Sequence, residues 1–281
     1  GNDFLNGFTG GDADIMSGGA GNDTYNNADS TADSLVEAAS GGTDTIYFPS
    51  GITFSGTKVG VTTTVATNAA LAQFEQIVLN GAITATFDDE QVSGQTLAWN
   101  TVGASVGTIT VTGGTTVTID ASNWTFDAIN YTNSAGAIVA GTAMTAADVV
   151  NLNGGSGVDT ITAPSIGSVI TGGGAIDVIT MGAGIDRSVV GTTAAVADTY
   201  SGFTSGTDIL DLSAALTAAT LTVGTIIAAG ASTTVTIANV DAAADTDAEV
   251  YYIDNANGLT LTQIETAITA GNAATGQATI L

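Results

Sequence analysis

A glycine-rich hexapeptide that ends in aspartate recurs along the chain, and it constrains the fold more than any other feature. Its four copies are GGAGND at 18–23, GGSGVD at 154–159, GGGAID at 172–177 and MGAGID at 181–186. We expect the residue two positions after such an aspartate to face a core, because an apolar side chain commonly stands there. The pairs are Asp3 and Leu5, Asp14 and Met16, Asp23 and Tyr25, Asp44 and Ile46, Asp159 and Ile161, and Asp177 and Ile179.

The spacing of these apolar residues indicates a period of nine, because Ile161, Ile170 and Ile179 follow one another at nine-residue steps. A glycine-rich turn of about six residues followed by a strand of about three builds a coil whose two half-turns stack in parallel on the next coil. Glycine permits the positive φ angles that such a turn needs. The repeat therefore predicts an all-β protein with parallel β-roll or β-helix segments.

Stacking would place turn aspartates of successive coils close together, where like charges about 4 Å apart repel one another unless a cation lies between them. Calcium suits that position, because it takes six to eight oxygen ligands at roughly 2.3–2.6 Å without requiring octahedral geometry. We therefore expect Ca²⁺ as the bound ion. The alternative is that these are ordinary Gly/Asp turns that bind no metal.

The repeats resemble the RTX, or hemolysin-type calcium-binding, family, whose consensus is GGxGxDxUx with U a large apolar residue. Two further stretches are similar to segments of RTX proteins. One runs from GGAGNDTY at 18–25 through LVEAASGGTDTI at 35–46 to FEQIVLNG at 74–81, and the other is ADTYSGFTSGTDILDLS, which ends at Ser213. The latter stretch resembles the segment that closes many RTX β-rolls near the type I secretion signal.

This resemblance implies calcium ligands in the turns, as aspartate carboxylates and glycine carbonyls. The pattern fails at three places: Asp12 occupies a glycine position, Ser168 replaces an aspartate, and Asp186 is followed by Arg187 and Ser188. Ligation is in doubt at the last two of these places, near Ser168 and at the end of the second block. The first three residues read as the second half of a repeat, so we expect the chain to begin inside a longer protein. The candidate metal ligands are Asp3, Gly10, Asp12, Asp14, Gly19, Gly21, Asp23, Asp44, Gly155, Gly157, Asp159, Gly173, Asp177, Asp186 and Asp208.

Charge and composition exclude several functions. Two basic residues, Lys58 and Arg187, stand against 27 acidic ones and leave a formal net charge of −25. A chain of this charge repels nucleic acid and is disfavoured at anionic membranes. No apolar stretch has the length of a membrane helix, so we expect no membrane insertion. Without histidine or cysteine, the chain cannot build a Ser-His-Asp triad, a cysteine nucleophile with its base, or an N/S zinc site.

A carboxylate pair could still hydrolyse glycosides, and residues 88–90 form the tightest acidic run outside the repeats. Adjacent acidic residues are more often a solvated loop or a peripheral cation site, and we predict that the protein is not an enzyme. Trp99 and Trp124 are expected in the core or at a cap and not in a sugar-binding platform.

We expect four segments: an RTX block at 1–60, a Thr/Val-rich β region at 61–150, a second RTX block with its closing segment at 151–213, and a C-terminal β region at 214–281. In the second segment, Thr alternates with Ile or Val from Thr108 to Asp120. A hairpin across Gly113 and Gly114 is the simplest interpretation, and a further coil of a β-helix is the alternative. In the last segment, a capping box at Thr262 and Glu265 predicts one short helix that ends near Gly271.

The expected function is structural. The chain is predicted to be a calcium-binding segment of a secreted bacterial protein, located outside the cell or on its surface, that self-assembles into an S-layer-like lattice or a filament. Its partners would be copies of itself joined through calcium-bridged acidic surfaces, and regions beyond the sequence could contact cell-surface polysaccharide. The alternative is a calcium-dependent secretion and folding module of a larger RTX enzyme, toxin or adhesin.

Overall fold

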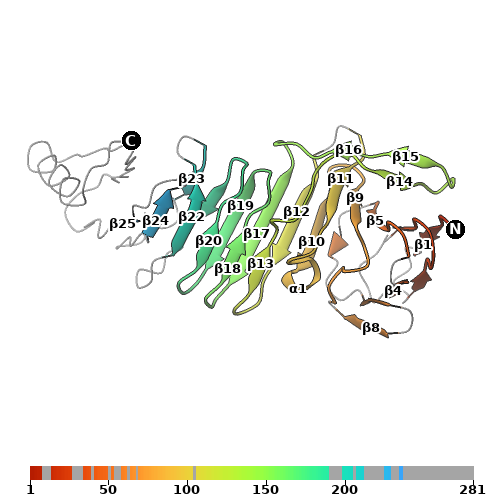
Figure 1. Ribbon diagram of the computed structural model, residues 1–281, viewed down its shortest axis with the longest axis horizontal. Coiled ribbons are helices and arrows are strands. Elements are labelled where there is room, and N and C mark those ends of the chain that lie inside the picture. The colour runs from red at the N-terminus through yellow and green to blue at the C-terminus, as the bar shows by residue number, and fades with distance from the viewer. Residues whose placement is uncertain are drawn as a thin grey trace, which may run out of the picture.

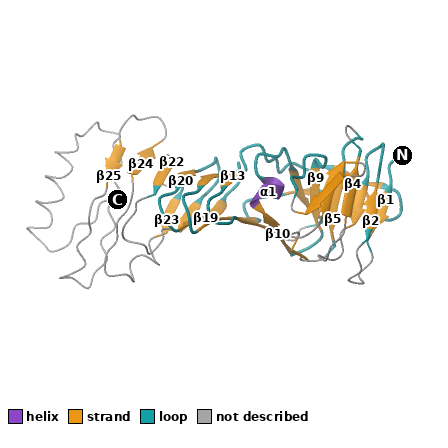
Figure 2. Cartoon of the chain, turned by 90° about the horizontal axis from the view of Figure 1, so that it is seen from below, coloured by secondary structure: helices purple, strands orange, loops and turns teal. Residues whose placement is uncertain are grey.

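The computed structural model describes residues 1–7, 14–26, 34–38, 41–49, 52–53, 58–61, 64–67, 69–103, 106–189, 198–204, 207–211, 225–228 and 234–236. These residues form an elongated parallel β-solenoid, in which coils stack side by side along the long axis (Figure 1). The predicted all-β fold is confirmed. Strands dominate the described chain, and its one helix, α1 (Asp89–Val92), lies at the side of the stack (Figure 2).

Four long sheets form the walls of the solenoid, and we call them sheets A to D. Sheet A contains, in spatial order, β1 (Phe4–Asn6), β3 (Thr24–Asn26), β5 (Thr45–Phe48), β9 (Gln76–Leu79), β11 (Ala98–Thr101) and β16 (Thr142–Ala143). Sheet B contains β2 (Ile15–Ser17), β4 (Ser34–Glu37), β7 (Lys58–Val61) and β8 (Thr64–Thr67).

Sheets C and D form most of the walls after residue 100. Sheet C contains β6 (Ile52–Thr53), β10 (Thr84–Asp88), β12 (Thr108–Thr112), β17 (Val149–Gly155), β19 (Ser168–Gly173), β21 (Arg187–Val189) and β23 (Ile209–Asp211). Sheet D contains β13 (Thr118–Asp120), β18 (Thr160–Thr162), β20 (Val178–Thr180), β22 (Thr199–Phe203), β24 (Thr225–Ala228) and β25 (Thr234–Thr236). Because sheet C begins beside the coils of sheet A and continues opposite sheet D, the two repeat blocks belong to one continuous solenoid.

The nine-residue period holds from β17 to β21, in the first part of the second block, and fails in the first block. Ile161 pairs with Ile179 in sheet D, whereas Ile170 lies between them in sequence but in sheet C, so that two half-turns make an 18-residue coil. In the first block, Thr24 pairs with Thr45, 21 residues on. The extra residues lengthen the connections between strands, which a solenoid tolerates because connections lie outside the stack.

The predicted hairpin at Gly113 and Gly114 is wrong. The strand before these glycines, β12, belongs to sheet C, and the strand after them, β13, belongs to sheet D. Each strand pairs in parallel with the corresponding strand of the next coil, β17 or β18. The glycines therefore make a corner of the solenoid, as the alternative interpretation proposed.

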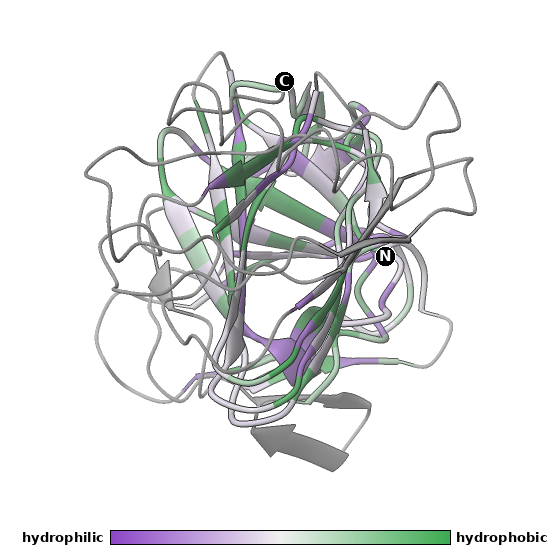
Figure 3. Cartoon of the chain, turned by 90° about the vertical axis from the view of Figure 1, so that its left-hand side faces the viewer, coloured by the Kyte–Doolittle hydropathy of each residue, from purple (hydrophilic) through white to green (hydrophobic). Residues whose placement is uncertain are grey.

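The core is one apolar cluster enclosed by the walls of the solenoid (Figure 3). The residues two positions after the repeat aspartates point into it, as predicted; Tyr25, Ile46, Ile161 and Ile179 are fully buried, Met16 is buried and Leu5 packs against the cluster. Aromatic rings fill the middle, where Phe87 meets Trp99 edge-on at 5.4 Å and Trp99 lies 4.8 Å from Trp124. Both tryptophans are buried, which confirms their placement in the core.

A two-stranded antiparallel hairpin leaves the solenoid and runs along its length. It consists of β14 (Asn130–Thr132) and β15 (Ile138–Ala140), and we call it the arm. The coil strands of Figure 1 run across the long axis, whereas the arm lies lengthwise over the N-terminal coils. Residues 214–224 and 237–281, including the predicted helix near Thr262, lie outside the described residues.

Candidate functional site: corner carboxylates and a buried acidic cluster

The repeat aspartates stack at the corners of the solenoid and accept hydrogen bonds from the coil before them. In the second block, the backbone N–H of Val117 donates to Oδ1 of Asp159 at 2.8 Å. The N–H of Asp159 donates to Oδ1 of Asp177 at 2.8 Å, and the N–H of Asp177 donates to Oδ1 of Asp198 at 3.0 Å. We call each such row of bonds a corner ladder.

A second corner ladder runs through Ser168, Asp186 and Asp208. The N–H and the hydroxyl of Ser168 both donate to Oδ1 of Asp186, at 2.8 and 2.5 Å, and the N–H of Asp186 donates to Oδ1 of Asp208 at 3.0 Å. The serine that replaces a repeat aspartate thus acts as a donor at the same corner. Burial raises the pKa of Asp186, and its bonds with Ser168 and Gly182 oppose that rise.

The second carboxylate oxygen at several corners accepts an N–H from its own turn. Gly155 donates to Oδ2 of Asp159 at 2.6 Å, Gly182 to Oδ2 of Asp186 at 2.8 Å, and Thr204 to Oδ2 of Asp208 at 2.7 Å. Such carboxylates have neutral hydrogen-bond donors on both oxygens. These corner carboxylates therefore stabilise the fold by accepting backbone N–H groups from their own turn and from the coil before it.

One corner carboxylate, Asp148, was missed by sequence reasoning. Its Oδ1 accepts the N–H of Gly107 in the preceding coil at 2.7 Å, and its Oδ2 accepts the N–H of Thr145 at 2.7 Å. The turn before it is TAA, without glycine. The available signal was an aspartate directly before an apolar strand, β17.

The turn glycines make close contact between coils possible. A Cβ atom on Gly155 would lie 1.7 Å from the carbonyl oxygen of Gly114, and one on Gly157 would lie 2.1 Å from that of Thr115. Gly173 has a φ of +110° and approaches the carbonyl oxygen of Gly155 in the same way, while that oxygen accepts the N–H of Gly174 at 3.0 Å. The close approach of successive turns is thus an observed reason for glycine at these positions.

The first block contains a third corner ladder, which runs through Asp3, Asp23, Asp44 and Glu75. The N–H of Asp3 donates to Oδ1 of Asp23 at 2.7 Å, and the N–H of Asp23 donates to Oδ1 of Asp44 at 2.8 Å. The N–H of Asp44 then donates to Oε2 of Glu75 at 2.8 Å. Glu75 was not predicted, although it stands directly before β9 as Asp44 stands directly before β5.

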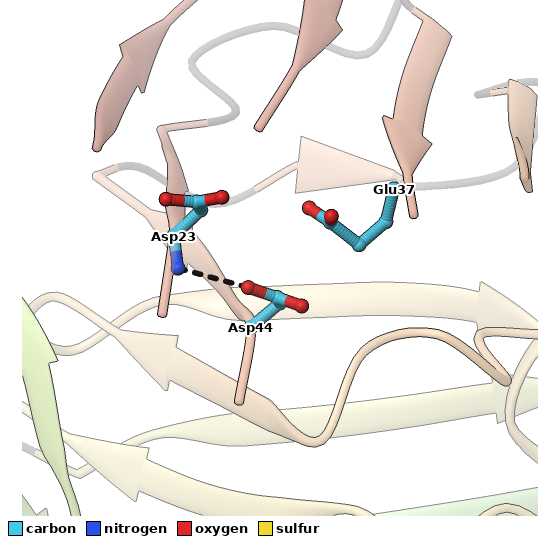
Figure 4. A group of neighbouring side chains, drawn as sticks. All are labelled: Asp23, Glu37 and Asp44. Atoms are coloured by element: carbon cyan, nitrogen blue, oxygen red, sulfur yellow. Dashed lines mark hydrogen bonds between the residues drawn. The ribbon is translucent and has the colours of Figure 1, made fainter. Parts of the chain in front are cut away.

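Three carboxylates converge beside this ladder, and we call Asp23, Glu37 and Asp44 the acidic cluster. One oxygen from each lies within 4.8 Å of the others, and all three side chains are buried. Figure 4 shows Glu37 reaching from β4, in sheet B, toward the two aspartates that precede β3 and β5 in sheet A. Glu37 was missed as a site residue; its signal was an acidic residue at the end of an apolar strand.

The cluster's hydrogen-bond donors among the described residues are all neutral. Glu37 accepts the N–H of Ala38 at 2.7 Å on Oε1 and the hydroxyl of Tyr25 on Oε2. Oδ2 of Asp23 is buried and has no hydrogen-bond partner in the described structure. Burial, together with the charges of Glu37, Glu75 and Asp23, raises the pKa of Asp44 to about 7, although the bond from the N–H of Asp23 opposes the rise.

This geometry fits a divalent cation with oxygen ligands. Two oxygens that each lie about 2.4 Å from one Ca²⁺ are at most about 4.8 Å apart, and the three oxygens of the cluster lie within that distance of one another. An unpartnered buried carboxylate oxygen is unfavourable unless a proton or a cation satisfies it. Asp23, Glu37 and Asp44 are therefore the residues that would hold the ion.

The other predicted ligands lie in different surroundings. Asp3 is exposed at the end of the third ladder, and the carbonyl oxygen of Asp14 accepts the N–H of Ser34 at 2.7 Å. Gly19 and Gly21 have positive φ angles, and the N–H of Gly21 donates to the carbonyl of Gly41. Gly10 and Asp12 lie outside the described residues.

Two carboxylates outside the acidic cluster remain notable. Oδ2 of Asp177 is buried without a hydrogen-bond partner in the described structure, and burial raises the pKa of this residue to about 6. In the run at 88–90, Asp89 is only 8% exposed and burial raises its pKa to about 6, so the expectation of a solvated loop is wrong for Asp89.

An ion pair joins Arg187 of β21 to Asp211 of β23, on neighbouring strands of sheet C. No helix in the described residues is long and apolar enough to cross a membrane. Comparison with protein-family models gives no match, and neither the curated proteins nor the solved structures searched contain a match.

Proposed function

We propose that this chain is a non-enzymatic structural segment of a secreted bacterial surface protein, and that Ca²⁺ bound at the acidic cluster stabilises its solenoid. The observation that carries the proposal is the convergence of three buried carboxylates, one oxygen of each lying within 4.8 Å of the others, together with the buried Oδ2 of Asp23, which has no hydrogen-bond partner in the described structure. Hard carboxylate oxygens without histidine or cysteine favour calcium over zinc or copper.

Two further properties support the proposal. The net charge of −25 opposes a compact state, and a bound cation reduces that repulsion where three carboxylates meet. The resemblance of the repeats to RTX sequences agrees with this chemistry. Extracellular calcium modules bind at about 10⁻⁴–10⁻³ M, so the segment would stay incompletely folded at cytosolic calcium levels and fold after secretion.

The test is calcium binding by the full chain and by two aspartate variants. Isothermal titration and circular dichroism should show calcium uptake with a gain of β structure. Asp23→Asn should weaken binding by at least about tenfold, because it removes the unpartnered ligand oxygen. Asp127→Asn, which removes one exposed carboxylate away from the cluster, should bind as the parent does.

Two outcomes would overturn the proposal. One is a chain that takes up no calcium and is fully folded in EGTA. The other is equal calcium affinity in the Asp23→Asn and Asp127→Asn variants. If a variant fails to fold, the number of calcium ions bound by the unmodified protein still tests the proposal.

Assembly into a surface lattice or filament is the second part of the proposal. A surface with this charge would repel its own copies, and calcium between chains would reduce that repulsion. Electron micrographs of the purified protein should show ordered assemblies in millimolar calcium and dispersed particles after chelation. Assemblies that survive EGTA, or particles that stay dispersed in calcium, would contradict it.

A further inference from the structure

The arm joins the same two coils that the acidic cluster joins, but from the outer face of sheet A. The ring of Tyr131, on β14, stacks on that of Tyr47, on β5, with centroids 5.6 Å apart and planes inclined by 28°. The next residue, Thr132, donates its N–H to Oγ1 of Thr24 on β3 at 3.2 Å. The two contacts of the arm therefore lie on neighbouring strands.

The arm covers a part of sheet A that would otherwise be an outer surface. Strand residues alternate between the two faces of a sheet, so Thr24 and Val78 face outward when Tyr25 and Ile77 face the core. Thr24 is nevertheless only 1% exposed, and Val78 is fully buried. By contrast, Val178, in an outward position of sheet D, is 41% exposed.

The base of the arm is fixed to the solenoid. The fully buried Asn100, on β11, accepts the N–H of Ile129 at 3.1 Å and donates to the carbonyl of Asp127. After the arm, β16 pairs antiparallel with β11. The arm is thus anchored at β11 and reaches across sheet A to β5 and β3.

The contacts of the arm lie close to the acidic cluster in sequence and in space. Thr24 follows Asp23 directly, and Tyr47 is the third residue after Asp44. Strands β3 and β5 pair in register, and the N–H of Asp23 donates to Asp44 across the same gap between coils. Any change in the spacing of these coils alters the cluster on the inside and the seat of the arm on the outside.

From this juxtaposition we infer that the arm is a strap whose docking is thermodynamically linked to cation binding at the acidic cluster. Without a cation, repulsion among the three carboxylates favours separation of the β3 and β5 coils, and separation disrupts the simultaneous contacts with Thr24 and Tyr47. A bound cation fixes the spacing and favours the docked arm. By reciprocity, the docked arm raises the cation affinity of the cluster by the same factor.

The inference rests on the proposed calcium site, and its test has two directions. First, Tyr131→Ala removes the stacking contact without touching the cluster. It should lower calcium affinity by about two- to tenfold, as expected for loss of one aromatic pair. The matched control is Ile138→Ala on the same arm, where the side chain is 67% exposed; its calcium affinity should equal that of the parent.

Second, hydrogen–deuterium exchange of residues 130–140 reports the arm directly. At a calcium concentration that saturates the parent but not Asp23→Asn, calcium should slow exchange there several-fold in the parent and much less in the variant. If calcium binds at the cluster but neither arm exchange nor the affinity of Tyr131→Ala changes, the linkage is wrong and the proposed function stands. If no calcium binds at the cluster, both the proposed function and this inference fail.

Discussion

The backbone N–H of Asp159 donates to Oδ1 of Asp177, at 2.8 Å, across the gap between two consecutive coils. The two aspartates occupy equivalent corners, because the strands that follow them pair in register with Thr160 opposite Val178. Each corner aspartate therefore acts as a donor toward one coil and as an acceptor toward the other. A substitution at such a corner can be judged by the number of N–H groups that its carboxylate accepts.

Asparagine should be tolerated at position 177 and not at position 159. The carboxylate of Asp159 accepts two N–H groups, from Val117 and Gly155, so the amide NH₂ of Asp159→Asn would face a donor. We expect a loss of about 1–3 kcal/mol in unfolding free energy. Asp177 accepts one N–H, and its Oδ2 lacks a partner in the described structure, so Asp177→Asn keeps that bond and removes a buried charge.

Urea unfolding in EGTA measures both variants under conditions where bound calcium cannot mask the difference. The expected order of stability is Asp177→Asn at or above the parent and Asp159→Asn below it. Equal destabilisation of the two would show that the corner ladders do not distinguish singly from doubly bonded carboxylates.

Because successive turns are in close contact, we expect alanine to destabilise the protein at one turn glycine, Gly155, and not at its neighbour in space, Gly114. Alanine at Gly155 would place its Cβ 1.7 Å from the carbonyl oxygen of Gly114, and backbone cannot yield as a flexible side chain can. Gly155→Ala should therefore destabilise the protein by about 2 kcal/mol or more. Gly114→Ala is the matched control, since a Cβ there meets nothing within 4 Å, and its melting temperature should stay within about two degrees of the parent's.

Stability without calcium should fall as the pH rises from about 4 to about 7. The pKa of Asp44 is raised from 3.8 to about 7, so the folded state holds a proton that the unfolded state releases at lower pH. That contribution is fully present below the unfolded pKa and is lost as the pH passes the folded one. Melting temperatures measured in EGTA across this pH range should therefore fall as the pH rises.

Asp44→Asn should flatten the pH profile measured in EGTA, and the remaining slope would come from other carboxyls with raised pKa values, such as Glu75, Asp89 and Asp177. In millimolar calcium the fall should disappear or reverse, because a cation binds the deprotonated cluster. A profile that is the same with and without calcium would contradict the assignment of Asp44 to the ion site.

Terbium, which replaces calcium at oxygen sites, should be sensitised by Tyr25. The hydroxyl of this tyrosine donates to Glu37, so an ion at the acidic cluster would lie beside the ring. Tyr25→Phe should abolish most of the sensitised emission excited near 275 nm, whereas Tyr47→Phe, on the outer face of the same sheet, should retain it. Emission that persists in Tyr25→Phe would place the bound ion elsewhere.

The fold class could be predicted from the sequence because the spacing of its repeats reflects the geometry of the coils. A strand position that recurs with glycine turns and aspartate corners leaves few structures other than a parallel solenoid, and the core placement of Ile161 and Ile179 was correct for that reason. The hairpin across Gly113 and Gly114 was predicted wrongly because two glycines between alternating strands fit either a hairpin or a corner. Only pairing with distant strands, 41 and 42 residues on, separates the two.

The candidate site was predicted only in part, because it depends on contacts across the solenoid. Asp23 and Asp44 carry the repeat signal, but Glu37 comes from the opposite sheet and lies outside any repeat. Glu75 joins the ladder 31 residues after Asp44, because the connection before β9 is long. No local pattern specifies such a length, since loop closure changes free energy only slowly with the number of residues.

The stacking of 18-residue coils also has a mechanical consequence. Corner ladders and sheet hydrogen bonds both run from coil to coil, so tension along the long axis loads the end coil first. Each coil that detaches would release about 60 Å of extended chain, at about 3.4 Å per residue, before the next coil takes the load. The coils of other lengths, such as the 21-residue coil between Thr24 and Thr45, would release a different length of chain, so the segment would lengthen under force in steps set by each coil and absorb strain without breaking as a whole.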